Sequence, residues 1–285
     1  MSDAEDPIPQ SDLPVRFAMG VVMVGIALVA TVLGGWWLRA LIGIAAALMI
    51  VEWADMQGIS RRWAWLVAAL LGAHLLAATQ YFFPVGDVDV VEEGGALVAA
   101  VFQERIDLAW TILATVAGGA AIIALASRRL AWGWGYLYIG APAAALIVLG
   151  WLDLSLVIWV FVVTWATDIM AYFAGRTIGG PKLAPRISPN KTWAGLIGGM
   201  LGAGIFGYGV ATWFEMEPLF LWLGAPMGLI AQAGDLYESW EKRRAGVKDS
   251  GRLLPGHGGV LDRLDGLLAV ALATMFVLMA GFWTA

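Results

Sequence analysis

The 285-residue sequence contains no cysteine and little charge, because only 14% of its residues are Asp, Glu, Lys or Arg. Without cysteine, neither a disulfide framework nor a thiolate metal site can form. A soluble domain carries about 25% charged residues. A chain that is 60% hydrophobic, with a mean hydropathy of +0.78, is therefore neither a water-soluble globule nor a disordered segment. Its 36 Gly and 16 Trp are typical of membrane proteins, which tolerate Gly inside helices and place Trp at the interfaces.

Nine hydrophobic segments are long enough to cross a bilayer, for which about 20 apolar residues are needed. None shows the alternation of a membrane barrel. The pattern predicts an all-α integral membrane protein, a polytopic bundle of about nine transmembrane helices. The segments lie near 17–34, 37–56, 63–83, 107–126, 131–150, 153–175, 193–213, 218–238 and 264–285.

The basic residues predict the orientation of these helices. Residues 1–16 lack the basic start of a signal peptide, so we expect a polar N-terminal tail. Alternation through nine spans places every Lys and Arg on the side of this tail, except Arg39 and Arg105. Cytoplasmic loops carry the Lys and Arg excess, so the N-terminus is expected to be cytoplasmic. The acidic stretch 85–106 is then expected to be a solvated outer loop.

Two predicted cytoplasmic loops, 176–192 and 239–263, hold most of the polar residues. They divide the chain into N-terminal helices over 17–150 and a catalytic transmembrane region over 151–285. If the eighth helix continues past 238, Asp235, Ser239 and Lys242 share one face of it. Asp262 and Asp265 share a face where the ninth helix begins. Because both loops lie on the same side of the membrane, they can meet in one site.

Converging carboxylates repel each other unless a cation joins them, and Mg²⁺ prefers a few carboxylates together with water and phosphate oxygens. Acids interleaved with many bases over 235–265 therefore indicate a metal–polyphosphate site. The glycines of Pro255-Gly256-His257-Gly258-Gly259 allow close approach to an anion. Ser188 is a candidate N-cap with Pro189 at the first helical position, where a helix N-terminus beside Lys191 suits phosphate.

Other polar residues admit two interpretations. Glu52 and Asp55 either cap the second span as a pair or form an outlying part of the site. His74 is expected to form a hydrogen bond between helices, whereas Asp168, near the end of the sixth span, is a candidate functional residue. Arg61, Arg62, Arg128 and Arg129 are explained by topology or by contact with anionic lipids.

The two loops resemble the phosphatidate cytidylyltransferase (CDP-diacylglycerol synthase) family. The matching residues are Ser239 with Lys242-Arg243, Lys248-Asp249, His257-Gly258-Gly259 and Asp262-Arg263-Leu264-Asp265, preceded by Gly234-Asp235, by Ser188 through Trp193 and by Asp168 through Gly175 with Arg176. The resemblance is dense over 165–266. Glu241, Gly266 and Asn190 depart from the usual pattern, but none of these departures removes a presumed ligand.

The resemblance implies that CTP and phosphatidate react to give CDP-diacylglycerol and pyrophosphate, with the site at the cytoplasmic face of a bacterial inner membrane. It implies Mg²⁺ held by Asp235, Asp262 and Asp265, and leaves room for a second cation such as K⁺. A homodimer is expected by analogy, and nucleic acid is not an expected partner. The implied catalytic residues are Asp235, Asp249, Asp262, Asp265, Lys242 and Lys248; the implied substrate-binding residues are Ser188, Lys191, Thr192, Ser239, Arg243, His257, Gly258, Gly259 and Arg263.

Three classes of protein are alternatives to this enzyme: a related CTP-dependent enzyme, a transporter and a membrane scaffold. A CTP-dependent lipid kinase, or a cytidylyltransferase for another lipid phosphate, would use a similar site with a different acceptor. A transporter would need ionisable groups near the bilayer midplane, whereas these acids lie at predicted helix ends and in loops. An inactive membrane scaffold would tolerate loss of the acidic side chains.

Overall fold

The computed structural model describes residues 12–82, 95–251, 253–254 and 258–282, and within them confirms the all-α membrane fold. The helices are α1 (Asp12–Leu33), α2 (Gly35–Met56), α3 (Arg61–Phe82), α4 (Gly95–Ser127), α5 (Leu130–Leu152), α6 (Leu154–Thr177), α7 (Trp193–Trp213), α8 (Phe220–Arg244) and α9 (Leu261–Val277), which a π-helical turn extends over Leu278–Phe282. Strands β1 (Lys182–Ala184) and β2 (Ser188–Thr192) form an antiparallel hairpin between α6 and α7.

Seven of the described helices are long and apolar enough to span a membrane. The apolar part of α1, Ala18–Leu33, is shorter, and α8 ends in the charged residues Lys242, Arg243 and Arg244. Large apolar side chains cover the exterior: Leu130 is 84% exposed and Trp213 is 82% exposed. Such an apolar exterior suits contact with lipid rather than with water.

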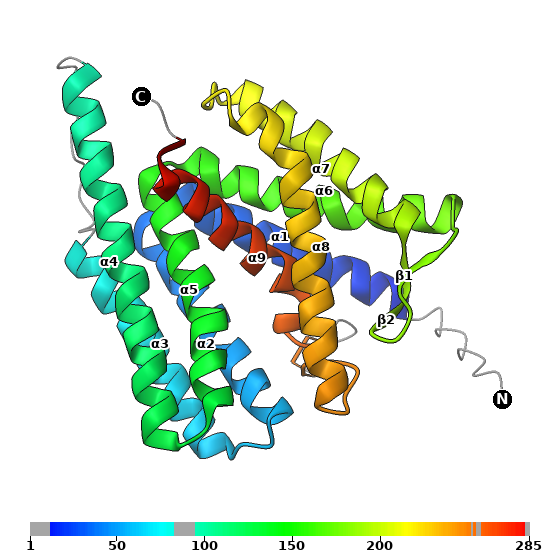
Figure 1. Ribbon diagram of the computed structural model, residues 1–285, viewed down its shortest axis with the longest axis horizontal. Coiled ribbons are helices and arrows are strands. Elements are labelled where there is room, and N and C mark those ends of the chain that lie inside the picture. Colours follow the sequence, from blue (N-terminus) through cyan, green and yellow to red (C-terminus); the bar gives the residue numbers. More distant parts are fainter. Residues whose placement is uncertain (1–11, 83–94, 252, 255–257, 283–285) are drawn as a thin grey trace.

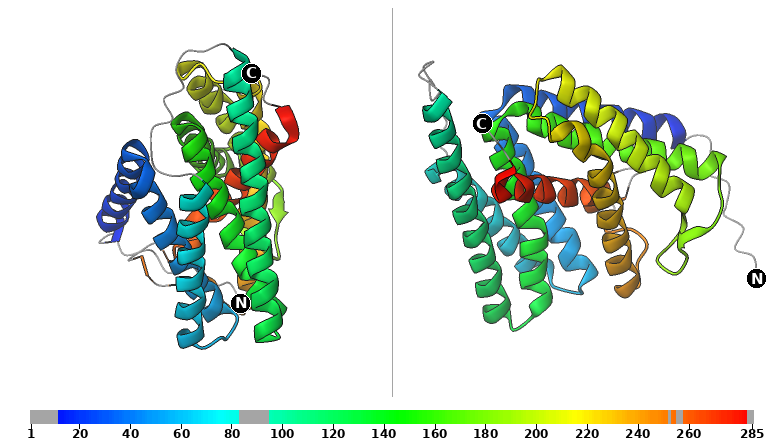
Figure 2. Two further views of the ribbon diagram at one scale, coloured as in Figure 1. Left: turned by 90° about the vertical axis from the view of Figure 1, so that its left-hand side faces the viewer. Right: turned by 45° about the horizontal axis from the view of Figure 1, so that its top comes forward.

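The helices form two groups that cross each other. Helices α4 and α5 run alongside α2 and α3, whereas α6 and α7 lie side by side in a different direction (Figure 1; Figure 2). Helix α9 packs against both α5 and α8, so it connects the two groups. The core includes Trp53, which is 1% exposed and donates its indole N–H to the carbonyl of Ala131 at 2.9 Å.

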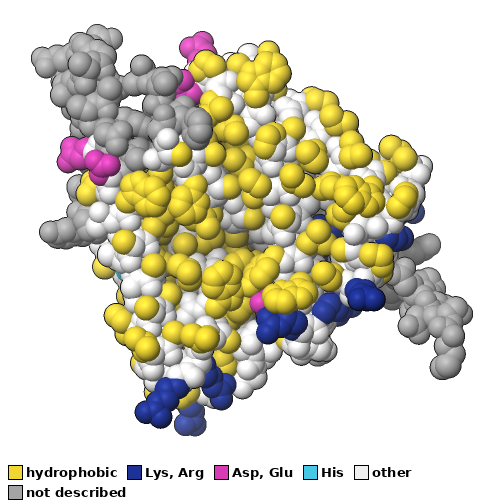
Figure 3. All heavy atoms as spheres, viewed as in Figure 1, with side chains coloured by type: hydrophobic (Ala, Val, Ile, Leu, Met, Phe, Trp, Pro, Cys, Tyr) yellow, Lys and Arg dark blue, Asp and Glu magenta, His cyan; other side chains and the backbone are white. Residues whose placement is uncertain are grey.

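Charged side chains gather at opposite ends of the helices. On the face shown in Figure 3, Lys and Arg lie along the lower and right-hand edge, while most of the Asp and Glu lie at the upper left. The lower and right-hand edge contains the turn between α4 and α5, the hairpin and the C-terminal end of α8 (Figure 1). The separation agrees with the alternation of helices that the basic residues predict.

Two local expectations are wrong. Helix α4 begins at Gly95, so 95–106 is helical and not a loop. Helix α1 begins at Asp12, and its apolar part, Ala18–Leu33, agrees with the predicted segment near 17–34. Residues 1–11 and 83–94 lie outside the described parts of the chain. Ser188 does not cap a helix. It begins β2, and Thr192 caps α7 instead, its hydroxyl accepting from the N–H of Gly195 at 3.0 Å.

Helices α7 and α8 approach each other closely at a glycine. A Cβ atom added to Gly224 in α8 would overlap the backbone carbonyl of Ala203 in α7. Backbone, unlike a flexible side chain, can relieve such an overlap only by separating the helices. Small residues permit this close approach in membrane proteins.

We therefore expect Gly224→Ala to lower the free energy of unfolding by about 1–3 kcal/mol, because a crowded interface must open. Thermal unfolding of the purified protein in detergent measures the change. Gly209→Ala in α7 is the control, because no atom lies within 4 Å of its added Cβ. Equal melting temperatures for the two variants would contradict the proposed packing.

Candidate active site

The site is built on a buried ion-pair network between α8 and α9. Lys242 lies at 2.5 Å from the carboxylate of Glu238 and at 2.6 Å from that of Asp262. The Glu238 side chain is fully buried, and those of Lys242 and Asp262 are 13% and 6% exposed. Burial disfavours the ammonium charge, but the two carboxylates outweigh it and raise the pKa of Lys242. Lys242 therefore stays charged and holds the two helix ends together.

Asp262 also organises the chain before α9. One of its oxygens accepts from the N–H of Gly259 at 2.7 Å, and both accept from the N–H of Ser250. Gly258 has a φ of +82°, which favours glycine, and a Cβ there would lie 2.7 Å from Asp262 Oδ2. In this structure Asp262 is thus held by Lys242 and by two backbone groups, in addition to being a predicted metal ligand.

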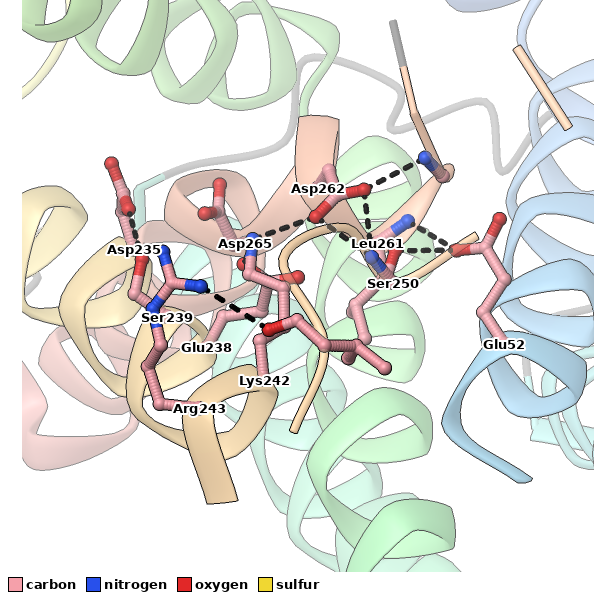
Figure 4. A network of polar contacts seen from close by, with 12 residues as sticks. Glu52, Asp235, Glu238, Ser239, Lys242, Arg243, Ser250, Leu261, Asp262 and Asp265 are labelled. Atoms are coloured by element: carbon pink, nitrogen blue, oxygen red, sulfur yellow. Dashed lines mark hydrogen bonds and ion pairs between the residues drawn. The ribbon is translucent and has the colours of Figure 1, made fainter. Parts of the chain in front are cut away.

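A second group of carboxylates lies beside this network, on three different helices. Asp235 in α8 and Asp168 in α6 both repel the carboxylate of Asp265 in α9, as does Glu238. Figure 4 shows Asp235 and Asp265 directed toward the same side, whereas Asp262 faces the loop that contains Ser250. The acidic cluster, defined as Asp168, Asp235 and Asp265, therefore concentrates negative charge where three helices approach one another.

The structure brings the two predicted loops together. Lys191 of β2 lies at 2.7 Å from Asp235, whose other oxygen accepts from Ser239 at 3.3 Å. The latter contact agrees with the predicted shared face of α8. Arg243 donates to the carbonyl of Ile187 at 3.3 Å, which adds a second contact between α8 and the hairpin. The pairing of Lys191 with Asp235 joins segments more than forty residues apart in the sequence.

The remaining predicted site residues differ in exposure and in contacts. Lys248, Asp249 and Arg263 are exposed, and Ser188 is half-buried in β2. Thr192 caps α7, Gly259 donates to Asp262, and the carbonyl of Gly258 accepts from Leu254 at 2.9 Å. His257 lies outside the described residues. The roles of these residues with substrate stay predictions.

The sequence-based set of site residues omits Glu238 and Glu52. Glu238 precedes Lys242 by four residues, and this spacing on a helix indicates an ion pair. Glu52 instead contacts residues about two hundred positions away along the chain. No local pattern could have identified that contact.

The donor set suits a hard divalent cation only in part. Carboxylate oxygens are its preferred ligands, and the acidic cluster has more acids than nearby bases, since Lys191 and Arg263 are the cations that attract Asp168. Among the residues that the structure describes, however, no three acids or histidines form a ready-made metal site. An ion would therefore need oxygens from a phosphate or from water to complete its ligands, as Mg²⁺ commonly does.

An apolar cavity of about 530 Å³ lies beside the basic end of α8. Its walls include Ala120 and Ala124 of α4 and Leu137 of α5, and its polar lining residues include Glu241 and Arg244. Arg244 stacks on Trp240 with its guanidinium carbon 4.6 Å from the ring centroid. The cavity thus combines apolar walls with a cationic side chain at the same end of the helices.

Comparison with known proteins identifies the family of this chain. The model of the cytidylyltransferase family matches residues 14–280. The chain belongs to this family. Relatives named phosphatidate cytidylyltransferase include those of Brucella abortus biovar 1 (54% identity over 122 residues, covering 41% of this chain and 44% of the relative) and Haemophilus influenzae (45% over 124 residues, covering 41% and 43%). A Rickettsia bellii relative of the same name is 40% identical over 131 residues, covering 43% and 57%. The chain spans about half the length of these relatives in the matches.

The buried network predicts a large effect of Lys242→Met. Loss of the ammonium group leaves Glu238 and Asp262 buried without a cation, which we expect to lower the free energy of unfolding by about 3–5 kcal/mol. Thermal unfolding in detergent measures the loss. The double variant Lys242→Met/Glu238→Gln should recover part of it, because one unpaired charge is removed.

Lys182→Met is the matched control, because Lys182 is exposed on β1. Its melting temperature should stay near that of the wild type. A Lys242→Met protein as stable as this control would show that the ion pairs do not hold α8 and α9 together.

Proposed function

We propose that this integral membrane protein transfers the cytidylyl group of CTP to phosphatidate, giving CDP-diacylglycerol and pyrophosphate. The observation that carries the proposal is the acidic cluster next to Lys191 and Arg263, at one end of an apolar helical fold that belongs to the cytidylyltransferase family. The names of the relatives support phosphatidate as the acceptor.

The reaction makes limited chemical demands on the protein. A phosphate oxygen of phosphatidate forms a bond to the α-phosphorus of CTP, and the bond from that phosphorus to the bridging oxygen of pyrophosphate breaks. The nucleophile is already an anion, so no strong general base is needed. Positioning of the two phosphates and neutralisation of their charge are then the main contributions to catalysis.

Asp235 and Asp265 are the proposed ligands for Mg²⁺, and Asp168 is added to them because it lies in the same cluster. When bound, the cation supplies neutralisation of phosphate charge. Asp262 completes the sequence-based metal set, although Lys242 and two N–H groups hold it in this structure. A second cation such as K⁺ would need further oxygen ligands, for which the exposed Asp249 is the candidate.

Three exposed basic residues are the candidates for holding the nucleotide phosphates. They are Arg243, Lys248 and Arg263, whereas Lys242 is held by two buried carboxylates. Lys191 is paired with Asp235, so a phosphate could replace that carboxylate as its partner. Arg243, Lys248, Arg263 and Lys191 are therefore the proposed phosphate ligands, and Lys242 acts through the position of Asp262.

Both substrates reach such a site if this end of the helices faces the cytoplasm. Phosphatidate keeps its acyl chains in the bilayer while its phosphate lies at the level of the headgroups, and CTP arrives from water. The basic residues at this end support a cytoplasmic orientation, and the bacterial relatives support the inner membrane as the location. The apolar cavity beside Arg244 suits an acyl chain of the lipid. A homodimer also belongs to this proposal, by analogy with the family.

The proposal predicts Mg²⁺-dependent release of pyrophosphate when the purified protein in detergent receives CTP and phosphatidate. Asp235→Asn and Asp265→Asn should each lower turnover by on the order of 100-fold or more, because the charge that organises the phosphates is lost. Glu217→Gln, in the turn between α7 and α8, is the control and should keep turnover within about twofold.

Lipid phosphates other than phosphatidate, and lipid alcohols, serve as competing acceptors in the same assay. Transfer of the γ-phosphate of CTP to a lipid alcohol would contradict the proposal, as would full activity of Asp235→Asn. Pyrophosphate release that is fastest with phosphatidate is the expected result.

A further inference from the structure

Glu52 of α2 is buried against residues that are not among the proposed metal or phosphate ligands. One of its carboxylate oxygens accepts from the N–H of Val260 at 2.8 Å. The other accepts from the N–H of Leu261 at 2.8 Å and from the hydroxyl of Ser250 at 3.1 Å. Glu52 is 5% exposed, so these contacts are made away from water. A residue of the N-terminal helices therefore binds the polar segment that precedes α9, as Figure 4 shows.

Glu52 and Asp262 together hold both ends of this segment. Ser250 donates its hydroxyl to Glu52 and its N–H to Asp262, and Gly259 donates its N–H to Asp262. The neighbouring glycines leave room for Glu52: a Cβ on Gly251 would lie 2.7 Å from one of its oxygens, and a Cβ on Gly259 would lie 2.6 Å from the other. The local sequence is therefore fitted to a carboxylate at this position.

Asp55, one turn further along α2, behaves differently. It pairs with Arg61 at 3.0 Å, and both side chains are well exposed. The sequence allows Glu52 and Asp55 either to cap the end of α2 or to belong to the site. Asp55 fits the first interpretation, because its partner Arg61 lies at the start of the next helix. Glu52 fits the other, because its partners belong to the segment that leads into Asp262 and Asp265.

The contacts to Val260 and Leu261 also satisfy N–H groups at the start of α9. The first N–H groups of a helix have no partner within it, and they attract negative charge. Glu52 supplies that charge from within the protein, so this helix end is already occupied and does not need a substrate phosphate. The carboxylate instead fixes where α9 begins and how its first turn is oriented.

We propose that Glu52 is a positioning residue for the reaction. By holding Ser250, Val260 and Leu261, it sets the orientation of the first turn of α9, and with it the carboxylates of Asp262 and Asp265. The effect on turnover rests on the proposed function, whereas the effect on the segment 249–262 does not.

The test uses Glu52→Gln in the full-length protein. Glutamine keeps the size of the side chain but removes the charge. Its NH₂ group cannot accept a hydrogen bond, so it must face one of the backbone N–H groups that donate to Glu52 in the wild type. We expect kcat to fall roughly 10- to 100-fold, the range for loss of charge-assisted hydrogen bonds. The KM for CTP should change far less, because the proposed phosphate ligands are untouched.

Asp55→Asn is the matched control, since it removes a carboxylate from the same helix outside this contact set. It should keep kcat near that of the wild type. Ser250→Ala is the second variant. Ser250→Ala removes one hydrogen bond to Glu52 and leaves the buried carboxylate in place. It therefore tests the proposal even if Glu52→Gln does not fold. We expect its kcat to fall by a smaller factor than that of Glu52→Gln.

Hydrogen exchange of the backbone amides provides a readout that needs no substrate. In Glu52→Gln, and to a smaller extent in Ser250→Ala, the amides of Ser250, Gly259, Val260 and Leu261 should exchange faster than in the wild type, with the amides of the other helices unchanged. Unchanged exchange at these amides would overturn the positioning role. A higher KM for CTP with an unchanged kcat would overturn it as well. A wild-type protein inactive toward CTP and phosphatidate would overturn the proposed function, while the exchange result would still decide the role of Glu52.

Discussion

The ammonium group of Lys242, shared between Glu238 and Asp262, is the interaction on which the rest of the site depends. Two carboxylates that are almost excluded from solvent carry a high desolvation cost, which a closely placed cation offsets. The contact joins α8 to the first turn of α9. It also holds Asp262 where the N–H groups of Ser250 and Gly259 can reach it. This arrangement, together with the contacts that Glu52 makes to Ser250, Val260 and Leu261, holds the loop before α9 and the first turn of α9.

In the acidic cluster, unlike the Lys242 network, repulsion between carboxylates exceeds the attraction of the nearby cations. Asp168, Asp235 and Asp265 come from three helices and repel one another, and Lys191 and Arg263 compensate only part of this charge. The free energy gained from helix packing must exceed the cost of this repulsion, as is common where binding sites concentrate like charges. A divalent cation with phosphate oxygens would relieve it. This is the physical reason to connect the cluster with nucleotide binding rather than with folding.

Much of the fold could be predicted because lipid-spanning helices are encoded by long apolar runs. All nine predicted segments are helical in the described parts of the chain, and the Lys and Arg distribution agrees with the observed helix ends. The start of α4 was missed because a few acids in an otherwise helix-forming stretch resemble a loop. The cap of α7 was misplaced because Ser188-Pro189 has the local chemistry of a helix start, while the pairing of β1 with β2 keeps the chain extended until Thr192.

The site was predictable to the extent that its contacts are local. Asp235 with Ser239 follows helical spacing, and the meeting of the two loops followed from the topology. The contacts of Glu52 with Ser250, Val260 and Leu261 depend on the packing of α2 against a distant segment, and no pattern within either segment specifies them. The charged residues are thus evident from the sequence, whereas the way in which the N-terminal helices hold them is not.

The most direct measurement of the central claim is binding of CTP with Mn²⁺ in place of Mg²⁺, followed by electron paramagnetic resonance of the purified protein without lipid substrate. If the acidic cluster and the neighbouring bases form a metal–triphosphate site, the wild type should retain Mn²⁺ only when CTP is present, and Asp265→Asn should not retain it. CTP binding of equal strength with and without a divalent cation, or retention of Mn²⁺ by Asp265→Asn, would contradict the account.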